Sequence, residues 1–394
     1  MSGSPSVKVG DVCKFQNGGT PSKSHDRYFR GKTPWITGAD ITSPVVTTAR
    51  SFITDEAIEN SATNRVPAGT ALLVTRTSVG KVAVAGVDLC FSQDITALTP
   101  SPNRLSTAYL IQFLKTKQAH FERHARGATI KGITREVVAD LHIPLPPLAE
   151  QRRIAAILDK AEALRAQRRA ALTQLDTLTQ SIFLEMFGDP VTNSKSWNRI
   201  EMSGAVVGKY GIKAGPFGSS LKKEDYAASG YRIYGQEQVI AGRFDIGDYY
   251  IGERKYQQLK SCAISESDLL VSLVGSFGKV LIVPAGIEAG IINPRLVKIT
   301  PNQALVTPNF LASLLQHQTV QAEFQRVAHG GTMGILNAGL LKQLKVILPP
   351  IALQREFTRL VMAVEKLGMT QQASLASQDA LFASLQYRAF RGEL

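Results

Sequence analysis

The residues of this chain that could do chemistry do not form a catalytic set. His120 and His124 are four positions apart and share one face of a predicted helix, but the residues between them do not match a zinc-hydrolase pattern. Gly278-Lys279 is followed by Val280, so it lacks the serine or threonine of a phosphate-binding loop. We therefore predict no metal site and assign the two histidines a solvated or phosphate-facing role.

Two further motifs also lack residues that their catalytic counterparts contain. Glu253-Arg254-Lys255 has the acid-x-lysine spacing of many nucleases, but no Pro-Asp pair precedes it. Asn293-Pro294-Arg295 approaches the tetrapeptide that holds a flipped adenine, yet it lacks the second proline and the aromatic residue. The sequence therefore predicts no catalytic residues in this chain.

Residues suited to contacts with phosphate gather in two loops, GGTPSKSHDRYFRGKTPW and GPFGSSLKKEDY. Glycine lets the backbone approach a phosphate closely, and lysine and arginine supply positive charge. Each stretch is, alternatively, an ordinary surface loop whose cations are only solvated. The predicted phosphate contacts are Lys23, Arg27, Arg30 and Lys32 in the first loop and Lys222 and Lys223 in the second.

Reading of bases requires donors and acceptors that reach the major groove, where arginine suits guanine and glutamine or asparagine suits adenine. The predicted base readers are Arg76, Thr77, Ser78 and Gln93, followed later in the chain by Gln236, Gln238, Ser276 and Arg295. The remaining predicted DNA-binding residues are Thr20, Lys81, Phe217, Ser219, Ser220 and Lys279.

The basic charge of the chain is confined to two blocks. Of the formal net charge of +13, residues 1–145 and 191–347 carry +6 each, residues 146–190 carry none and residues 348–394 carry +1. A surplus in two matching blocks is expected if each block meets a polyanion independently. Nucleic acid is the predicted ligand, and the alternative is a basic protein without such a partner. A membrane surface would instead require a basic amphipathic helix.

The two blocks are copies of one module. Leu145-Pro146-Pro147 with Gln151-Arg152 returns 203 positions later as Leu348-Pro349-Pro350 with Gln354-Arg355. Upstream, GKVAVAG corresponds to GKVLIVPAG at offsets of 198 to 200. A period near 200 residues is too long for a solenoid and indicates two whole domains.

The neutral segments after each block predict long helices over residues 148–187 and 351–390. The first contains no glycine or proline, and apolar residues recur at three-and-four spacing in both, as in a coiled coil. We expect the two helices to pack antiparallel on each other; the alternative is that each folds back on its own domain. The predicted helix-packing residues are Ile154, Ala161, Leu164, Leu175, Leu178, Ile182, Phe357, Val361, Val364, Leu375, Leu381 and Leu385.

In each basic block, glycine and proline residues separate short β-rich runs, and a short helix-like stretch ends the block. This pattern predicts α/β domains. We predict domains over residues 1–145 and 191–347 and helices within 146–190 and 348–394. The three cysteines lie far apart without CxxC pairing, so they indicate neither a disulfide framework nor a zinc site. Without a signal peptide or an apolar run near 18 residues, we expect a cytoplasmic protein.

Four motifs give the chain a specific resemblance. PLPPLAEQRRIAAILDKAEAL follows the first block, SIFLEMFGDP ends its helix, GPFGSSLKKEDY lies in the second block and FRGEL closes the chain. Together they resemble the specificity subunit of type I restriction-modification enzymes over essentially the whole chain. The chain departs from the pattern in two places: the first block has GGTPSKS in place of GPFGSS, and Gly368 interrupts the second helix.

The resemblance implies two tandem α/β target recognition domains, separated and linked by two long antiparallel coiled-coil-like helices about a pseudo-twofold axis. It implies a non-catalytic subunit that reads a bipartite target in double-stranded DNA and holds two adenine methyltransferase (modification) subunits, joined by motor-nuclease (restriction) subunits in the full complex. S-adenosylmethionine would then bind the methyltransferase partner, and this chain would bind no cofactor.

The residues leave two other functions open. One is a free-standing DNA-binding protein, such as a regulator, that uses the helices as a ruler; the other is a nuclease with an unrecognised site. If two domains related by a pseudo-twofold axis face one side of DNA, their half-sites should be centred about one helical turn, roughly 10 base pairs, apart. The half-sites should differ, because Thr20–Asp40 and Gly215–Gln238 diverge within a shared frame.

Overall fold

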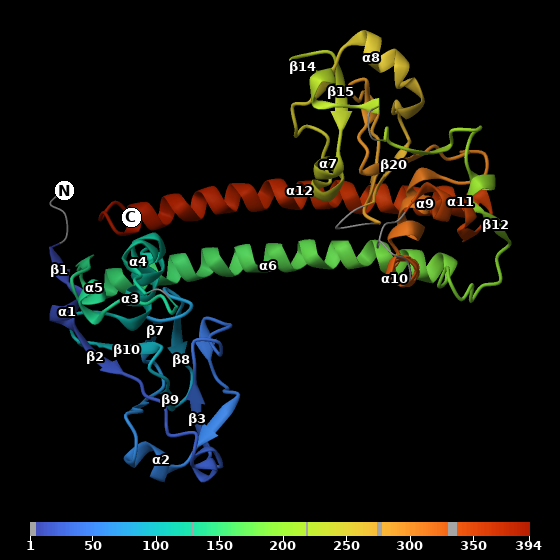
Figure 1. The fold of residues 1–394 in the computed structure, drawn as a ribbon. Coiled ribbons are helices and arrows are strands. Elements are labelled where there is room, and N and C mark those ends of the chain that lie inside the picture. Colours follow the sequence, from blue (N-terminus) through green and yellow to red (C-terminus); the bar gives the residue numbers. More distant parts are fainter. Residues whose placement is uncertain (1–4, 128, 218–219, 274–277, 330–336) are drawn as a thin grey trace. The chain divides into compact units, whose positions relative to one another are not determined.

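The computed structural model of the chain describes residues 5–127, 129–217, 220–273, 278–329 and 337–394. The chain divides into two compact units (Figure 1). Unit 1 comprises residues 1–169 and 373–394, and unit 2 comprises residues 170–372.

Unit 1 is built on a five-stranded sheet in the order β2-β10-β7-β8-β4. The strands are β2 (Cys13–Asn17), β10 (Ile95–Pro100), β7 (Ala71–Val74), β8 (Val82–Ala85) and β4 (Val45–Val46). All four residues of β7 are buried. Ala71 and Leu73 join the apolar cluster that contains the helices of the unit, and Leu72 and Val74 join a cluster on the opposite face. Alternation along an extended strand thus explains why a continuous apolar run serves two cores.

A second sheet of unit 1 has the order β5-β3-β9-β6, and a third pairs β1 with β11. The strands are β5 (Ser51–Ile53), β3 (Thr33–Ile36), β9 (Leu89–Phe91), β6 (Arg65–Val66), β1 (Ser6–Lys8) and β11 (His142–Pro144). β3 and β9 run parallel, with Ile36 opposite Phe91. The segments that follow these two strands therefore leave the sheet at the same edge.

Unit 2 repeats this arrangement. Its sheets have the orders β13-β20-β17-β18, β14-β16-β15-β19 and β12-β21. The strands are β13 (Ile212–Ala214), β20 (Leu296–Ile299), β17 (Leu269–Ser272), β18 (Val280–Ile282), β14 (Tyr226–Ala227), β16 (Tyr250–Ile251), β15 (Tyr231–Tyr234), β19 (Gly290–Ile292), β12 (Arg199–Glu201) and β21 (Lys345–Ile347). β15 and β19 are parallel, as β3 and β9 are in unit 1. The repeat found in the sequence is therefore a repeat of sheet topology, and the α/β class is confirmed.

Short helices connect and cover the strands of each unit. Those of unit 1 are α1 (Val9–Val12), η1 (Asp26–Phe29), α2 (Asp55–Glu59), α3 (Thr107–Lys115), α4 (Gln118–His124) and α5 (Arg135–Ala139). Those of unit 2 are η2 (Met202–Ala205), η4 (Lys223–Asp225), α7 (Gln236–Ala241), α8 (Glu253–Gln258), η5 (Lys260–Cys262), α9 (Pro308–Gln316), α10 (Gln318–His329) and α11 (Ala338–Gln343). The apolar faces of α3 and α9 enter the main core of their own units.

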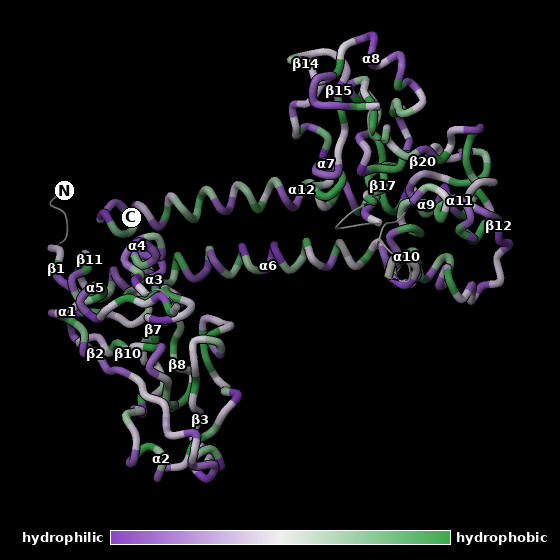
Figure 2. The backbone as a smooth tube through the Cα atoms, in the orientation of Figure 1, coloured by the Kyte–Doolittle hydropathy of each residue, from purple (hydrophilic) through white to green (hydrophobic). Residues whose placement is uncertain are grey.

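Two long helices, α6 (Leu148–Phe187) and α12 (Ile351–Ala389), occupy the predicted ranges. In unit 1, the Arg165 guanidinium of α6 lies 4.2 Å from the centre of the Phe382 ring of α12, and its Nε donates to Asp379 Oδ1 at 2.6 Å. In unit 2, the rings of Phe183 and Phe187 of α6 lie 5.7 and 5.3 Å from that of Phe357 of α12. The early half of each helix thus meets the late half of the other, and the predicted antiparallel pairing is confirmed. Figure 2 shows polar and apolar residues alternating along both helices.

The prediction for the helix-packing residues is wrong at three positions. Leu164, Leu178 and Leu381 are exposed, at 47%, 42% and 58%. Ile154, Phe357 and Val361 are buried in the unit cores, and the side chains of Ala161, Leu175, Ile182, Val364, Leu375 and Leu385 are half-buried. The physical reason is that the helix pair meets through an aromatic cluster in unit 2 and an arginine-aromatic contact in unit 1. A continuous leucine seam does not form.

The repeated glutamine of the LPP motif fastens each long helix to its unit. Gln151 Nε2 donates to the carbonyl oxygens of Arg104 (2.8 Å) and Pro146 (2.9 Å), and its Oε1 accepts the Ser106 N–H (2.9 Å). Gln354 Nε2 donates in the same way to the carbonyl oxygens of Leu305 (3.0 Å) and Pro349 (2.8 Å), and its Oε1 accepts the Thr307 N–H (3.0 Å). Both glutamine side chains are fully buried. Each one satisfies three backbone groups that would otherwise be buried without a partner.

Among the described residues, no helix is both long enough and apolar enough to cross a membrane.

Candidate nucleic-acid interface

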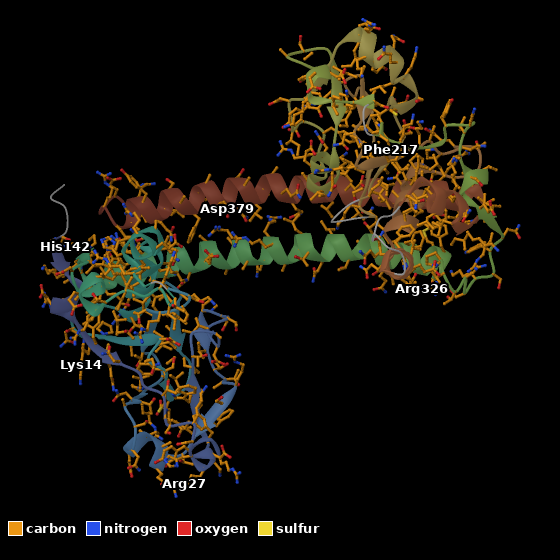
Figure 3. All side chains as sticks on the ribbon, viewed as in Figure 1. Lys14, Arg27, His142, Phe217, Arg326 and Asp379 are labelled. Carbon is orange, nitrogen blue, oxygen red and sulfur yellow. The ribbon has the colours of Figure 1, made fainter. Side chains whose placement is uncertain are left out.

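The first predicted phosphate loop of unit 1 joins β2 to β3 and is exposed along most of its length. Lys23, Arg27, Arg30 and Lys32 are all exposed. Arg27 lies 2.9 Å from a carboxylate oxygen of Glu56, and Figure 3 shows it at the end of unit 1 remote from α6. All four cations are accessible to an anion, but Arg27 already pairs with Glu56, so Lys23, Arg30 and Lys32 are the stronger candidates for phosphate contacts. Thr20, at the start of the loop, is half-buried.

The loop between β7 and β8 presents a second set of predicted residues. Arg76, Thr77, Ser78 and Lys81 are exposed, and Thr77 has a left-handed φ of 66°. Gln118 of α4 secures this loop by donating to the Val79 carbonyl at 3.1 Å. A cavity of about 390 Å³ opens between the loop and α4, and its polar lining includes Thr77, Ser78, Lys81, Gln118, Glu122 and Lys131. Lys81 and Lys131 are cations and Glu122 is a carboxylate, so the lining carries a net positive charge, which favours an anionic ligand.

Gln93 is exposed in the loop that follows β9. The next residue, Asp94, accepts the backbone N–H groups of Thr75 and Arg76 through its carbonyl, at 2.8 and 3.2 Å. The structure therefore brings the predicted base readers of unit 1, Gln93 and the loop from Arg76 to Ser78, to the same edge of the sheet.

Asp40 removes one arginine of unit 1 from the candidate interface. Arg50 Nε donates to Asp40 Oδ1 at 2.7 Å, and Thr37 donates to Oδ2 through its N–H and its hydroxyl, both at 2.8 Å. Partial burial alone would raise the pKa of Asp40, but these hydrogen bonds from Arg50 and Thr37 prevail and lower the pKa to about 2. Arg50 is therefore committed to a carboxylate that stays ionised.

The predicted phosphate loop of unit 2 lies between β13 and β14 in the corresponding place. Phe217 is 69% exposed, and Ser220, Lys222 and Lys223 are exposed as well. Asp225 accepts the Lys222 N–H at 2.8 Å and lies 3.0 Å from Lys255 Nζ, which orders the turn beneath the lysines. The prediction for Ser219 lies outside the described residues.

The β17–β18 loop of unit 2 is held like its counterpart. Gln321 Nε2 donates to the Gly278 carbonyl at 3.0 Å, and Gly278 has a positive φ of 76°. Its neighbour Lys279 is exposed. The predicted base reader Ser276 lies outside the described residues.

The prediction that Gln238 reads a base is wrong. Gln238 is fully buried: its Oε1 accepts the Gly235 N–H at 2.7 Å, and its Nε2 donates to the Ile246 carbonyl at 2.7 Å. The side chain closes the first turn of α7, so it has no free edge for DNA. Gln236 is half-buried.

Glu237, next to Gln238, belongs to a site that the sequence analysis missed in part. A cavity of about 800 Å³ in unit 2 is lined by Lys223 and Arg295, which were predicted, and by Tyr226, Glu237, Tyr249 and Asn293, which were not. The signal for these four was weak, because they are far apart in the sequence. The pairing of β15 with β19 brings Glu237 and Asn293 together, and the pairing of β14 with β16 brings Tyr226 close to Tyr249.

No cluster suited to a metal is present among the described side chains, where no group of three or more histidine, cysteine, aspartate or glutamate residues converges. The arrangement instead offers cations, amides, hydroxyls and aromatic rings on exposed loops, which are the groups that contact phosphates and base edges.

Comparison with known proteins agrees with this chemistry. Residues 1–174 and 217–372 match the family model described as the type I restriction modification DNA specificity domain. The chain is 23% identical over 410 aligned positions to the type I restriction enzyme MjaIX specificity subunit of Methanocaldococcus jannaschii, with 98% of this chain and 93% of that protein covered. It is 32% identical over 163 residues to the EcoR124I/EcoR124II specificity subunit of Escherichia coli, which spans 40% of each protein.

Two solved structures share the fold. The S subunit of a type I restriction-modification system from M. genitalium gives a TM-score of 0.61 at 16% identity and covers 98% of this chain and 96% of its own. A chain from a structure of type I restriction-modification complex assembly gives a TM-score of 0.62 at 16% identity and covers 100% and 99%. Together with the family match over most of its length, the repeated units and exposed basic loops lead to one assignment: the chain belongs to the family of type I restriction-modification DNA specificity subunits.

Proposed function

We propose that this chain reads a bipartite sequence in double-stranded DNA, with one half-site for each unit, and scaffolds two adenine methyltransferase subunits. In this proposal the chain performs no chemistry. S-adenosylmethionine binds the methyltransferase partner, and motor-nuclease subunits join in the full complex. The reaction that the complex directs is methylation of adenine N6, together with restriction where those subunits are present, and it takes place in the cytoplasm.

One observation carries the proposal: a similar sheet topology occurs twice, with different residues on equivalent loops. The β2–β3 loop presents Lys23, Arg30 and Lys32, whereas the β13–β14 loop presents Phe217, Lys222 and Lys223. Phosphate contacts position a protein on DNA, and the groups that reach base edges specify the sequence. Two copies of one frame with different loops are therefore suited to two different half-sites.

The exposed leucines of the long helices support the scaffolding role. Leu164, Leu178 and Leu381 contribute little to the cores of their units, and their exposed side chains offer apolar surface that another subunit can cover. These residues are our candidates for contact with methyltransferase subunits.

The test is to co-express the chain with an adenine methyltransferase subunit of a type I restriction-modification system from the same genome and to map methylated bases in DNA from those cells. We expect the two proteins to co-purify, and we expect methylated adenine within a split motif whose halves differ. A continuous palindromic motif would contradict independent reading. Specific binding without any methyltransferase partner would favour a free-standing DNA-binding regulator.

A separate assay tests whether the chain is itself a nuclease. The purified chain is incubated with double-stranded DNA and Mg²⁺ in the absence of other subunits. We expect intact DNA, and cleavage by this chain alone would overturn the proposal.

A further inference from the structure

The cavity of about 800 Å³ in unit 2 lies at the carboxyl edge of a parallel strand pair. Tyr234, the last residue of β15, is opposite Ile292, the last residue of β19. The residues that follow, Gly235 to Glu237 and Asn293 to Arg295, therefore leave the sheet side by side. The Asn293 N–H donates to the Tyr234 carbonyl at 2.8 Å, which fixes this register one step beyond the strands. Ligand sites in α/β proteins form preferentially at such edges.

The geometry of this edge depends on close packing. A Cβ atom on Gly235 would lie 2.7 Å from Asn293 Nδ2, and one on Gly215 would lie 1.9 Å from the Asn293 carbonyl oxygen. Both glycines thus let the loops approach. Asn293 Oδ1 accepts the Arg295 N–H at 2.9 Å and so orients the turn that carries the arginine.

Three charged side chains that line this cavity have no charged or hydrogen-bonding partner among the described residues. Within the described part of the chain, the side chains of Arg295, Glu237 and Lys223 make no ion pair and no hydrogen bond. Arg295 and Glu237 line the same space, yet they do not pair with each other. Opposite charges that share a cavity without pairing are suited to a ligand that presents an acceptor to one and a donor to the other.

Two tyrosines complete the cavity wall. The rings of Tyr226 and Tyr249 lie 5.5 Å apart, and the residues are 40% and 55% exposed. Exposed aromatic residues beside a lysine fit the sugar-phosphate backbone that flanks a base pair, with Lys223 placed to contact a phosphate.

We propose that Arg295 and Glu237 read one G·C base pair in the half-site of unit 2, an inference that rests on the proposed function. Guanine offers O6 and N7 as a pair of acceptors that a guanidinium binds bidentately, and cytosine offers its N4 amino group to a carboxylate. Of the four base pairs, G·C and its inverse are those that offer two adjacent acceptors to a guanidinium and a donor to a carboxylate; an A·T pair places its donor between two separated acceptors.

The corresponding edge of unit 1 carries different residues. Three positions beyond β3 and β9 stand Ala39 and Asp94, where unit 2 has Glu237 and Arg295. Asp94 uses its carbonyl to hold the β7–β8 loop, and Asp40 is occupied by Arg50. The arginine-glutamate pair is therefore specific to unit 2, and its base pair belongs to one half of the target.

The test selects bound sequences from a pool of random duplexes with the full-length chain, in complex with its methyltransferase if that is needed for binding. The variants are Arg295→Ala, Arg295→Lys and Glu237→Ala, and Arg254→Ala is the matched control, an exposed arginine of the same unit on α8 outside the cavity. We expect Arg295→Ala to reduce discrimination at one G·C pair by about 5-fold to 150-fold. We expect Glu237→Ala to relax the same pair and Arg254→Ala to change nothing.

Arg295→Lys separates base reading from charge. Lysine keeps the positive charge but lacks the planar fork, so affinity for non-specific DNA should persist while preference for guanine falls. The inference is overturned if the two alanine variants affect different base pairs, or weaken all sequences equally. A wild-type chain that selects no bipartite motif would refute the proposed function itself. A bipartite motif that is unchanged in every variant would refute only the reading by Arg295 and Glu237.

Discussion

Gln151 and Gln354 show how a repeated residue can be structural. Each side chain satisfies two carbonyl groups and one N–H group at the junction between a long helix and its unit. Replacing either with alanine leaves these groups buried without partners, so we expect Gln151→Ala and Gln354→Ala each to cost about 2 to 4 kcal/mol in urea unfolding. Arg152 and Arg355 belong to the same motif but are exposed, and their alanine variants should change stability by less than about 0.5 kcal/mol. Equal effects of glutamine and arginine variants would contradict this role.

The exposed lysines and arginine of the β2–β3 loop should act through phosphate. A lost phosphate contact lowers the slope of log K against log salt by about one unit. We therefore expect Lys23→Ala, Arg30→Ala and Lys32→Ala each to weaken binding across sequences and to reduce that slope. Arg50→Ala is the control, because Arg50 is committed to Asp40. Titrations of a fluorescent duplex at several salt concentrations measure the slope, and a parental slope in all three variants would remove this loop from the interface.

His317 should make unit 2 sensitive to mild acid. Burial lowers its pKa from the ordinary value of 6.5, although the Asp189 carboxylate opposes this shift. Below pH 6.5 the unfolded histidine binds a proton that the folded one resists. Stability from this residue is therefore complete above that pH and falls as the pH drops toward the folded pKa. The lowered pKa of Asp189 acts only near and below its ordinary value of 3.8, outside this window.

The measurement compares urea unfolding at pH 7.5 and pH 5.5. His317→Gln should lose less stability between these pH values than the parent chain, because it removes the group whose folded pKa is lowered. His142→Gln serves as the control, because His142 is exposed. An unchanged pH dependence in His317→Gln would show that this histidine does not titrate on unfolding.

At the scale of elements, the long helices pack through a few large side chains. Phe357 is fully buried, and its ring meets those of Phe183 and Phe187. We expect Phe357→Ala to destabilise unit 2 by about 3 to 5 kcal/mol, because it removes the centre of this cluster. The exposed leucines provide the contrast: Leu178→Asp and Leu381→Asp should cost less than about 1 kcal/mol in the isolated chain. Chemical denaturation tests both predictions. A large loss of stability in the leucine variants would support a continuous apolar seam between the two helices.

The same leucine variants have a second outcome at this scale. If Leu178 and Leu381 contact methyltransferase subunits, their aspartate variants should fold normally yet fail to co-purify with that partner. Loss of stability and loss of assembly are thus separated by measuring both.

At the scale of the whole molecule, the repeat predicts that each unit reads its own DNA half-site independently of the other. Exchanging residues 1–145 for the corresponding segment of a related chain should change one half of the methylated motif while the other half stays fixed. The reason is that each unit has its own sheets and its own core, so its loops are supported locally. Mapping methylated bases before and after the exchange measures the effect. A change in both halves would show that the units read DNA together.

The sequence alone determined the features that depend on local pattern. The long helices over residues 148–187 and 351–389 follow from apolar periodicity, and the duplicated topology follows from the repeated LPP and GKV motifs. The exposure of Lys23 and Lys222 follows from loops rich in glycine and hydroxyl residues. Such signals are encoded within a few turns or strands, so they can be read without knowledge of distant contacts.

Only the tertiary structure decided which groups are free. The residue type of Gln238 suits a base, but the turn of α7 buries its side chain, while its neighbour Glu237 faces a cavity. Leu381 fits the helical period, yet its side chain is 58% exposed. Glu237 and Arg295 meet at one edge because β15 and β19 pair in parallel across a long stretch of chain. Burial and long-range strand pairing depend on the whole packing arrangement, and no local pattern of residues encodes them.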